Sequence, residues 1–588
     1  MRPALHARQR VSKAVSVAFP TLSNPPVLLF GDSLAAHEHQ NIAMNSAVFT
    51  RDGTTNIGRI TTSSNPISNS LWGTPRVQLV NLSDTTMEVQ GRNNYADSGA
   101  GSTTVSIHTR QSDAVATGVP TFNPTTAASG VTQTISNGTI INLERKSHRG
   151  VAHAWNALAG GGMDIIGNLG HPGALASGMG AELAYAKQLL ALYTNPVVAL
   201  RLGINDIKGG ATPNTTFTAA KVILDGLTGL DGNGGNAFVV LYSCTAVGSV
   251  QSGYATLNEQ VIGKCATSAA PTVLNVDSTQ YTVGGVLQHT YNYQLYQYAL
   301  ANPGKVIFVD ATSCDYNFTH TCMFDATYPD AGGYPHTADG THILTNGALL
   351  NGAQVNSATS SKISFPLIVP RSASDATTPG GHTRLLNKGP WVGTTVTTGF
   401  LTGGSASTTL PKGGTGGQPS GWACGRTSGS GTMAVSVYDG GDASTNGYWV
   451  NMECTAGAAN DIVAAYPCGA GGVSPASLGV AATDTSELEL VFELRWDNVH
   501  AAGVELVQAY FPTNSGGAYG LATSGEELES VGILPDVVAA GTRFIRTGRL
   551  QMSSASITAV VPQILVKFGS ITGVTCNVGV RCVGIIKY

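Results

Sequence analysis

The sequence predicts an α/β domain with a parallel sheet, a β-rich insertion within that domain, and an all-β sandwich after it. Short apolar runs alternate with helical patterns over about residues 146–368, which indicates a parallel sheet with helices on both faces. Residues 46–145 and 391–588 are instead rich in Thr, Ser, Gly and Val and show almost no helical periodicity. A chain of 588 residues is long enough for several such domains.

The first strand of the α/β domain is expected at residues 27–30, an apolar run that ends abruptly at Gly31-Asp32-Ser33. A serine just after such a strand lies at the edge where open parallel sheets place their ligands. Gly, Asp and Ser are also ordinary turn residues, and Ser33 could simply cap a helix. We expect this domain to comprise residues 1–45 and 146–368.

The α/β pattern stops after residue 45. Residues 46–145 contain short alternating segments, such as 75–80 and 103–107, which are typical of half-buried strands between turns. The insertion either decorates the surface or forms a rim beside the site, because loops at the carboxyl ends of strands line active sites. The sequence leaves both interpretations open.

The α/β pattern resumes near Gly150. Helices are expected at 151–158, 174–193, 212–227 (capped by Asn214 or Thr215), 286–301 and 342–352. Strands are expected at 163–166, 197–202, 237–242 and 305–310. Strands that alternate with helices in this way favour parallel pairing.

The segment 369–390 is rich in Pro, Ser, Thr and Gly and is expected to be a linker. Beyond it, residues 487–494, 557–566 and 578–585 alternate over most of their length, which favours a β-sandwich. Aromatic side chains on a sandwich can form a platform for sugar rings, although they pack in cores more often. We therefore expect core positions for the tryptophans of this region, Trp391, Trp422, Trp449 and Trp496.

Charged residues make up 11% of the chain and the net charge is -4, so nothing favours a nucleic-acid-binding surface. A basic segment that includes Arg2 and Arg8 is followed by an apolar stretch that Pro20 interrupts, and no apolar run is long enough to span a membrane. We expect no membrane span, and an extracellular or virion-associated location without a recognisable signal peptide.

The chain has 9 cysteines, an odd number that leaves at least one unpaired. Three pairs are close enough in sequence to form disulfides: Cys314/Cys322, Cys454/Cys468 and Cys576/Cys582. No spacing of Cys and His resembles a zinc site.

Four polar segments fall at the ends of the expected strands. They are Gly31-Asp32-Ser33-Leu34, Asn168-Leu169-Gly170-His171-Pro172-Gly173, Gly203-Ile204-Asn205-Asp206 and Asp339-Gly340-Thr341-His342. Their order and residue types resemble the GDSL, or SGNH, hydrolase family over about residues 24–36 and 150–360. The resemblance implies a flavodoxin-like three-layer α/β fold and a serine esterase that forms an acyl-enzyme intermediate. It does not extend to the insertion or to the C-terminal region.

The chemistry of ester hydrolysis explains these residue types. A serine hydroxyl needs a base, so His342 would take the proton of Ser33, and Asp339 would orient the imidazole. The tetrahedral intermediate needs preorganised hydrogen-bond donors. The resemblance assigns these to the backbone N–H groups of Ser33 and Gly173 and to the side-chain amide of Asn205. This mechanism requires no metal and no cofactor.

Each segment alone has a purely structural interpretation as a turn or a helix cap, and only their combination favours the hydrolase. Other polar residues are weaker candidates. His171 fits a partly exposed turn residue better than a substrate contact, and His336 fits the role of the base less well than His342. Arg201 fits a structural ion pair better than a substrate clamp.

The C-terminal region loosely resembles jelly-roll carbohydrate-binding modules. Together with the hydrolase motifs it suggests an O-acetylated polysaccharide as the ester substrate. A second interpretation is a phage tail or surface adhesin that binds a polysaccharide receptor, with or without deacetylase activity. The sequence does not determine the acyl group, the alcohol or the oligomeric state.

Overall fold

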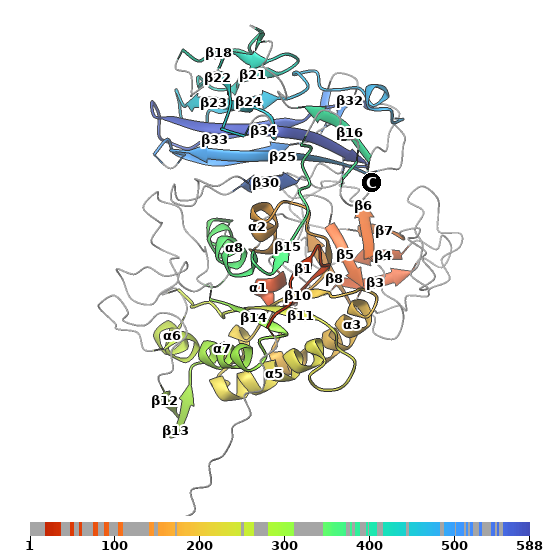
Figure 1. Cartoon of the computed structure of the whole chain (residues 1–588), viewed down its shortest axis with the longest axis vertical. Helices are drawn as coiled ribbons and strands as arrows, with labels where there is room; N and C mark the ends of the chain where they lie inside the picture. Colours follow the sequence, from red (N-terminus) through yellow and green to blue (C-terminus); the bar gives the residue numbers. More distant parts are fainter. Residues whose placement is uncertain are drawn as a thin grey trace, which may run out of the picture.

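The computed structural model describes residues 18–36, 47–51, 58–61, 75–79, 88–92, 104–109, 140–145, 151–170, 173–248, 252–263, 280–310, 341, 345–371 and, with gaps, 375–587. An α/β domain is interrupted after the first strand of its parallel sheet by a small barrel of strands, and a β-sandwich follows it along the chain (Figure 1). The expected fold class is therefore confirmed.

The α/β domain is built on a five-stranded parallel sheet with the order β14-β11-β10-β2-β9. The strands are β2 (Val27–Gly31), β9 (Ile165–Gly170), β10 (Val197–Arg201), β11 (Phe238–Tyr242) and β14 (Val306–Val309). Read from β9, the strands come second, first, third, fourth and fifth in the chain. This is the flavodoxin-like order.

Helices cover both faces of the sheet because successive side chains of a strand point to opposite faces. Leu28 and Phe30 of β2 pack with α3 (Gly180–Leu190), α5 (Pro213–Thr228), α6 (Tyr254–Ile262) and α7 (Tyr291–Ala301). Val27 and Leu29 pack with α2 (Val151–Leu158) and α8 (Thr345–Thr359). The three layers are visible in Figure 1. Among the described residues, no helix combines the length and hydropathy needed to span a membrane.

Two helix starts differ from the expectation. Helix α5 is capped by Thr212, whose Oγ1 accepts a hydrogen bond from the Thr215 N–H at 3.2 Å, and not by Asn214 or Thr215. Pro213 explains this start, because proline favours the first helical position. Helix α7 begins only at Tyr291, after the cap Thr290.

The residues before α7 form a hairpin in place of the expected helical turn. Strand β12 (Gln280–Val283) pairs with β13 (Val286–His289). The glycines between them, Gly284 and Gly285, have φ values of 57° and 82°. A Gly-Gly pair favours this type of tight turn over a continuous helix.

Three further elements have boundaries that differ from the expectation. Strand β9 begins two residues later than expected and continues through Gly170, so part of the second polar segment lies in the sheet. The helix expected at 174–193 is divided into a 3₁₀ turn, η2 (Ala176–Gly178), and α3. His342, expected to open the last helix, lies outside the described residues, and α8 begins at Thr345.

The insertion contains six antiparallel strands that close into a barrel with the order β3-β4-β7-β6-β5-β8. They are β3 (Ala47–Arg51), β4 (Gly58–Thr61), β5 (Pro75–Leu79), β6 (Glu88–Arg92), β7 (Thr104–Thr109) and β8 (Ile140–Arg145). The strands expected at 75–80 and 103–107 are thus confirmed as β5 and β7. A role of this barrel as a rim stays a prediction.

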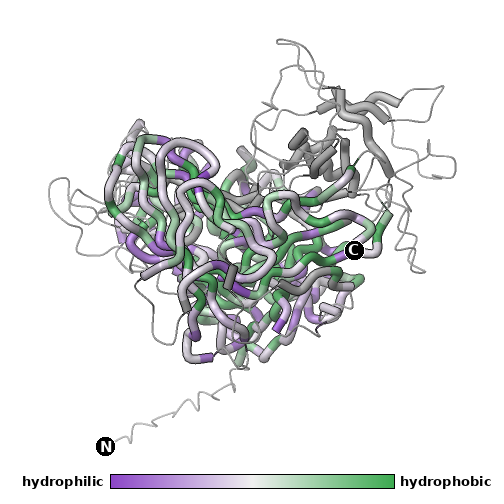
Figure 2. Tube along the Cα trace, turned by 90° about the horizontal axis from the view of Figure 1, so that it is seen from above, coloured by the Kyte–Doolittle hydropathy of each residue, from purple (hydrophilic) through white to green (hydrophobic). Residues whose placement is uncertain are grey.

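The C-terminal region is a sandwich of two main sheets. The larger sheet comprises β16 (Thr383–Lys388), β18 (Gly404–Ala406), β19 (Thr415–Gly416), β22 (Thr432–Tyr438), β23 (Trp449–Thr455), β25 (Glu487–Asp497), β30 (Arg543–Arg546), β31 (Leu550–Gln551) and β34 (Thr575–Lys587). The smaller sheet comprises β21 (Ala423–Ser428), β24 (Ile462–Tyr466), β26 (Val504–Tyr510), β29 (Leu528–Val531) and β33 (Gln563–Phe568). One apolar core contains inward-facing residues of both sheets. In Figure 2 hydrophobic residues gather along these strands.

Short strands complete the structure at the edges. Strand β1 (Leu22–Ser23) pairs with β15 (Ile363–Ser364), and β17 (Val396–Thr397) pairs with β20 (Gln418–Pro419). Strands β27 (Thr513–Ser515), β28 (Ala518–Gly520) and β32 (Ile557–Val560) form a three-stranded sheet, and η4 (Ala476–Leu478) is a 3₁₀ turn.

The segment 369–390 is not simply a linker, because β16 pairs with β34 within the larger sheet. Just before it, Ile368 and Val369 pack against Val491 and Ile586 of that sheet. The composition of this segment is typical of a linker. Its residues Val369 and Leu385, however, pack against strands far away in the sequence, and local composition does not reveal such contacts.

The tryptophans of the sandwich behave largely as expected. Trp422 and Trp496 lie in the core and are 5% and 4% exposed. Trp449 is 2% exposed. The centroid of its ring lies 4.4 Å from the Cζ of Arg495 and 4.3 Å from the Cζ of Arg581. These three indoles therefore do not form an open platform. Trp391 lies outside the described residues.

Cys454, Cys576 and Cys582 are free thiols, so the pairs Cys454/Cys468 and Cys576/Cys582 are not formed. Sheet register explains this result, because Cys454 on β23 lies opposite Cys576 on β34. Cys582 instead donates to the Asn446 carbonyl, with an Sγ–O distance of 3.0 Å. Cys314 and Cys322 are outside the described residues.

The sandwich contacts the α/β domain through β30. Arg546 forms an ion pair with Glu489 at 2.8 Å and donates to the carbonyl oxygens of Gly161 and Met163 at 3.3 and 3.4 Å. Gly161 also fits closely here, since a Cβ at this position would lie 2.8 Å from the Cβ of Phe544. These contacts fix the larger sheet against the loop that follows α2.

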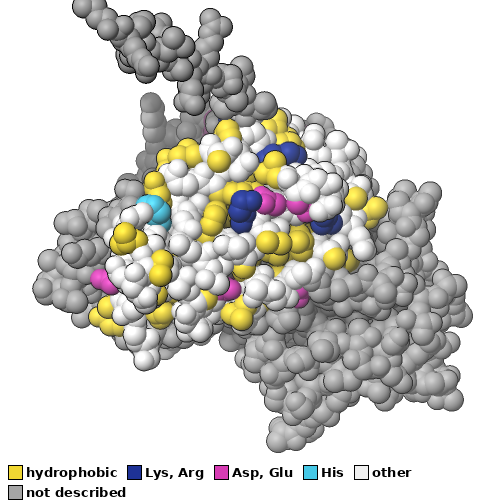
Figure 3. Space-filling model, turned by 90° about the horizontal axis from the view of Figure 1, so that it is seen from below, with side chains coloured by type: hydrophobic (Ala, Val, Ile, Leu, Met, Phe, Trp, Pro, Cys, Tyr) yellow, Lys and Arg dark blue, Asp and Glu magenta, His cyan; other side chains and the backbone are white. Residues whose placement is uncertain are grey.

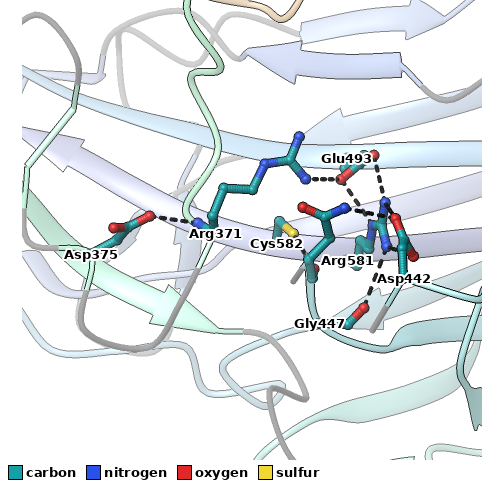
Figure 4. A network of polar contacts seen from close by, with 8 residues as sticks. Arg371, Asp375, Asp442, Gly447, Glu493, Arg581 and Cys582 are labelled. Atoms are coloured by element: carbon teal, nitrogen blue, oxygen red, sulfur yellow. Dashed lines mark hydrogen bonds and ion pairs between the residues drawn. The ribbon is translucent and has the colours of Figure 1, made fainter. Parts of the chain in front are cut away.

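A second polar network holds the connecting segment on the larger sheet (Figure 4). Glu493 binds Arg581 through two hydrogen bonds of 2.9 and 3.0 Å and Arg371 through one of 3.1 Å. Arg581 also binds Asp442. Arg371 thus ties the end of the α/β domain to the sandwich.

Candidate active site

Three of the four polar segments meet at the carboxyl edge of the parallel sheet. Gly31, at the end of β2, pairs in register with Gly170 of β9 on one side and with Arg201 of β10 on the other. The segments that follow these residues therefore begin as neighbours. The chain reverses its direction of travel across the sheet between β2 and β10, which is where open α/β sheets bind ligands.

The first segment is a sharp turn from β2 into the short helix α1 (Ser33–Ala36). Gly31 has a φ of 150°, and a Cβ there would lie 1.7 Å from the Arg201 carbonyl oxygen, so only glycine fits. Asp32 is buried and its Oδ1 accepts the Leu34 N–H at 2.9 Å. These contacts place Ser33 at the first position of α1, directly after the sheet edge.

The second segment ends in an exposed turn. Gly173 has a φ of 72°, a left-handed conformation that favours glycine, and no atom lies within 4 Å of a Cβ built there. Its backbone is therefore open to a bound molecule. His171 and Pro172 lie outside the described residues.

The third segment forms the turn from β10 into α4 (Ile204–Lys208). Gly203 has a φ of 115° and packs against the ring of Tyr291, whose hydroxyl a Cβ would approach to 2.5 Å. Tyr291 donates from that hydroxyl to the Leu202 carbonyl at 2.9 Å. Burial raises the pKa of Tyr291 well above its usual value, so it remains a neutral donor. Asn205 follows at the start of α4, half-buried.

Helix α4 binds the second segment through two adjacent side chains. The Asn205 Nδ2 donates to the Ala174 carbonyl at 3.2 Å. The Asp206 carboxylate accepts the Ala176 N–H, with distances of 3.1 Å to Oδ1 and 3.0 Å to Oδ2. Burial raises the pKa of Asp206, and the hydrogen bond from Ala176 opposes that rise.

The fourth segment is described only at Thr341. This residue is 3% exposed, and its Oγ1 accepts a hydrogen bond from the Lys208 Nζ at 3.2 Å. The residue that precedes His342 therefore contacts the end of α4. Asp339, His342 and His336 lie outside the described residues, and their roles stay predictions.

Arg201 is not placed to clamp a substrate, because it is only 1% exposed. It is the last residue of β10, in a region where Asp32 and Cys244 are also buried. Burial raises the pKa of the Cys244 thiol there, Asp32 raises it further, and Arg201 lowers it. The expected ion pair of Arg201 stays a prediction.

The sequence did not single out Asp206, Lys208 or Tyr291 for a role in the site. Asp206 was interpreted as a possible cap of the next helix. It does cap a helical turn, but that turn is η2, which precedes it by 30 residues. No local pattern identified Lys208 or Tyr291. Within the described part of the chain, no group of three His, Cys, Asp or Glu side chains is placed to hold a metal ion.

Several solved structures are similar to parts of this chain. A member of the lipolytic G-D-S-L family from Veillonella parvula has 16% identity and a TM-score of 0.23, and the match covers 36% of this chain and 88% of that protein. A peptidoglycan O-acetylesterase has 10% identity and a TM-score of 0.24, with coverage of 58% and 91%. A xylan-binding domain from Paenibacillus barcinonensis has 10% identity and a TM-score of 0.19, with coverage of 35% and 95%. No family model matches the sequence, and no curated protein matches it.

Proposed function

We propose that this protein is a serine ester hydrolase. The observation that carries the proposal is the meeting of Ser33, the Gly173 turn and Asn205 at the carboxyl edge of β2, β9 and β10. Three segments from distant parts of the sequence bring a hydroxyl residue, an open backbone turn and a side-chain amide to one place. That combination suits acyl transfer.

The proposed reaction has two steps. The Ser33 hydroxyl attacks the ester carbonyl while His342, oriented by Asp339, accepts the proton. The backbone N–H groups of Ser33 and Gly173 and the Asn205 amide donate to the resulting oxyanion. The tetrahedral intermediate collapses, and His342 returns the proton to the departing alkoxide. Water, activated by His342, then hydrolyses the acyl-enzyme and releases the acid.

We further propose an O-acetylated polysaccharide as the substrate. The support is that one chain contains both this site and a β-sandwich. Arg546 and Arg371 hold the sandwich against the α/β domain that carries the site. A long polymer can contact the sandwich while one of its esters occupies the site. The three tryptophans described in the sandwich are buried, so we do not place the sugar contact on them.

The experiment that tests catalysis compares hydrolysis of p-nitrophenyl acetate by the wild type, Ser33→Ala and His342→Ala. Loss of the nucleophile or the base is expected to lower kcat by about 10⁶-fold. Ser364→Ala on β15 and His289→Ala on β13 are matched controls away from the site. Wild-type rates in both site variants would refute the proposal.

The substrate is tested by acetate release from a panel of acetylated polysaccharides. Release from one polymer class, lost in Ser33→Ala, is the expected result. If a polysaccharide binds equally well to wild type and Ser33→Ala and no acetate is released, the protein is an adhesin and the substrate proposal fails.

A further inference from the structure

We propose that Asp206 is a positioning residue that holds the Gly173 turn in the geometry needed for oxyanion binding. This inference rests on the proposed esterase function and extends it. It assigns a role to a buried carboxylate that takes no part in the proton transfers described above.

Among the described residues, few pack against the turn at Gly173. Gly173 is exposed with open space around it, and Leu175 is 44% exposed. Ala176, in contrast, is 2% exposed and opens the 3₁₀ turn η2. Its N–H belongs to the first turn of that helical segment, so it has no partner within the segment and must find one elsewhere.

Asp206 supplies that partner from another part of the chain. It is 6% exposed, and both carboxylate oxygens lie within 3.1 Å of the Ala176 nitrogen. No side chain of the residue before η2 caps this turn. A carboxylate on a backbone N–H is a charge-assisted bond, and it is stronger than a neutral one.

Asn205 and Asp206 hold the turn at two points. Asn205 donates to the carbonyl of residue 174, and Asp206 accepts from the N–H of residue 176. These two contacts fix the backbone immediately after Gly173. The Asn205 amide carries a second N–H, which the proposed mechanism directs at the oxyanion. Fixing the turn therefore fixes two of the three proposed oxyanion donors relative to each other.

A misplaced donor lowers the rate without removing the nucleophile. Displacement of a reacting group by about 1 Å costs about 10²-fold, and loss of one oxyanion donor costs about 10²–10³-fold. We therefore expect Asp206→Ala to lower kcat by about 10–100-fold. Because the interaction acts on the transition state, kcat and kcat/KM fall together and KM changes little.

The experiment measures ester hydrolysis and hydrogen exchange for the wild type, Asp206→Ala, Asp206→Asn and Asp225→Ala. Asparagine keeps an oxygen that can accept from the Ala176 N–H, so Asp206→Asn restores most of the rate. Asp225, on α5, is the matched control, since its carboxylate accepts a hydrogen bond from the Tyr298 hydroxyl at 2.7 Å and takes no part in the proposed positioning of the turn. The Ala176 amide should exchange about tenfold faster in Asp206→Ala and at a near-normal rate in Asp206→Asn.

The outcomes separate the two proposals. An active wild type whose kcat stays within about threefold in Asp206→Ala, with unchanged exchange at Ala176, overturns the role of Asp206 and leaves the esterase intact. A wild type that hydrolyses no ester overturns the esterase and this inference together. If Asp206→Ala does not fold, Asp206→Ser takes its place. The serine hydroxyl is polar, but it is one bond shorter than the carboxylate and so does not reach the Ala176 N–H.

Discussion

Replacing Glu493 by alanine should destabilise the sandwich strongly, because this carboxylate is shared by two arginines. It accepts two hydrogen bonds from Arg581, at 2.9 and 3.0 Å, and one from Arg371 at 3.1 Å. The Glu493 and Arg581 side chains are only 3% and 5% exposed. The substitution therefore leaves a buried guanidinium with Asp442 as its remaining carboxylate partner in this network (Figure 4).

Breaking a buried ion pair by removing one partner costs about 3–5 kcal/mol. For a domain of about 200 residues, 1 kcal/mol lowers the Tm by about 2–4 °C, so we expect a decrease of about 6–20 °C. Asp442→Ala is the matched comparison. Asp442 binds the same arginine but is 40% exposed. Water can therefore replace part of the hydrogen bonding that Arg581 loses, and the decrease in Tm should be smaller.

The assay is thermal unfolding of the full chain by calorimetry. Several domains can unfold in separate transitions, so the sandwich transition is identified first with Val580→Ala, a change in its core. If Glu493→Ala shifts that transition no more than Asp442→Ala does, burial does not control the strength of this network and the reasoning is wrong.

Three further predictions concern the site, the sheet and the pH dependence of stability. Asn205→Ala should lower kcat for p-nitrophenyl acetate by about 10²–10³-fold, and full activity would remove Asn205 from the oxyanion hole. Gly31→Ala should destabilise the α/β domain by about 3 kcal/mol or more in urea unfolding, because the new Cβ would meet the Arg201 carbonyl at 1.7 Å; an unchanged midpoint would contradict this. Hydrogen bonds from Arg581 lower the pKa of Asp442 below its usual value of 3.8. Asp442 therefore stabilises the fold above that value and loses this effect as the pH falls through its lowered pKa, so Asp442→Asn should be less stable than wild type at pH 7 and equal to it in strong acid.

The expected lack of a nucleic-acid-binding surface stays a prediction. On the face seen in Figure 3, Lys and Arg side chains are few, and those near its centre lie beside acidic side chains.

Local sequence patterns predicted most elements of the α/β domain but missed strands that form only by pairing with another segment of the chain. Residues 27–31 and 197–201 were found as strands because their apolar runs are buried on both faces. Residues 286–289 were expected in a helix, yet they pair with β12 across two glycines. Residues 383–388 were assigned to a linker, but their pairing with β34 places them in the sandwich.

For the site, the sequence by itself predicted the kinds of chemical groups and their order: Ser33, Gly173, Asn205, Asp339 and His342. It could do so because the proposed ester hydrolysis demands a nucleophile and a base, and because the short segments that resemble the hydrolase family lie next to recognisable strands. Only the tertiary structure decided which segments meet, since strand order in a parallel sheet depends on pairing between residues far apart in the chain. It also revealed Asp206, because a carboxylate that binds a backbone N–H 30 residues away leaves no local pattern.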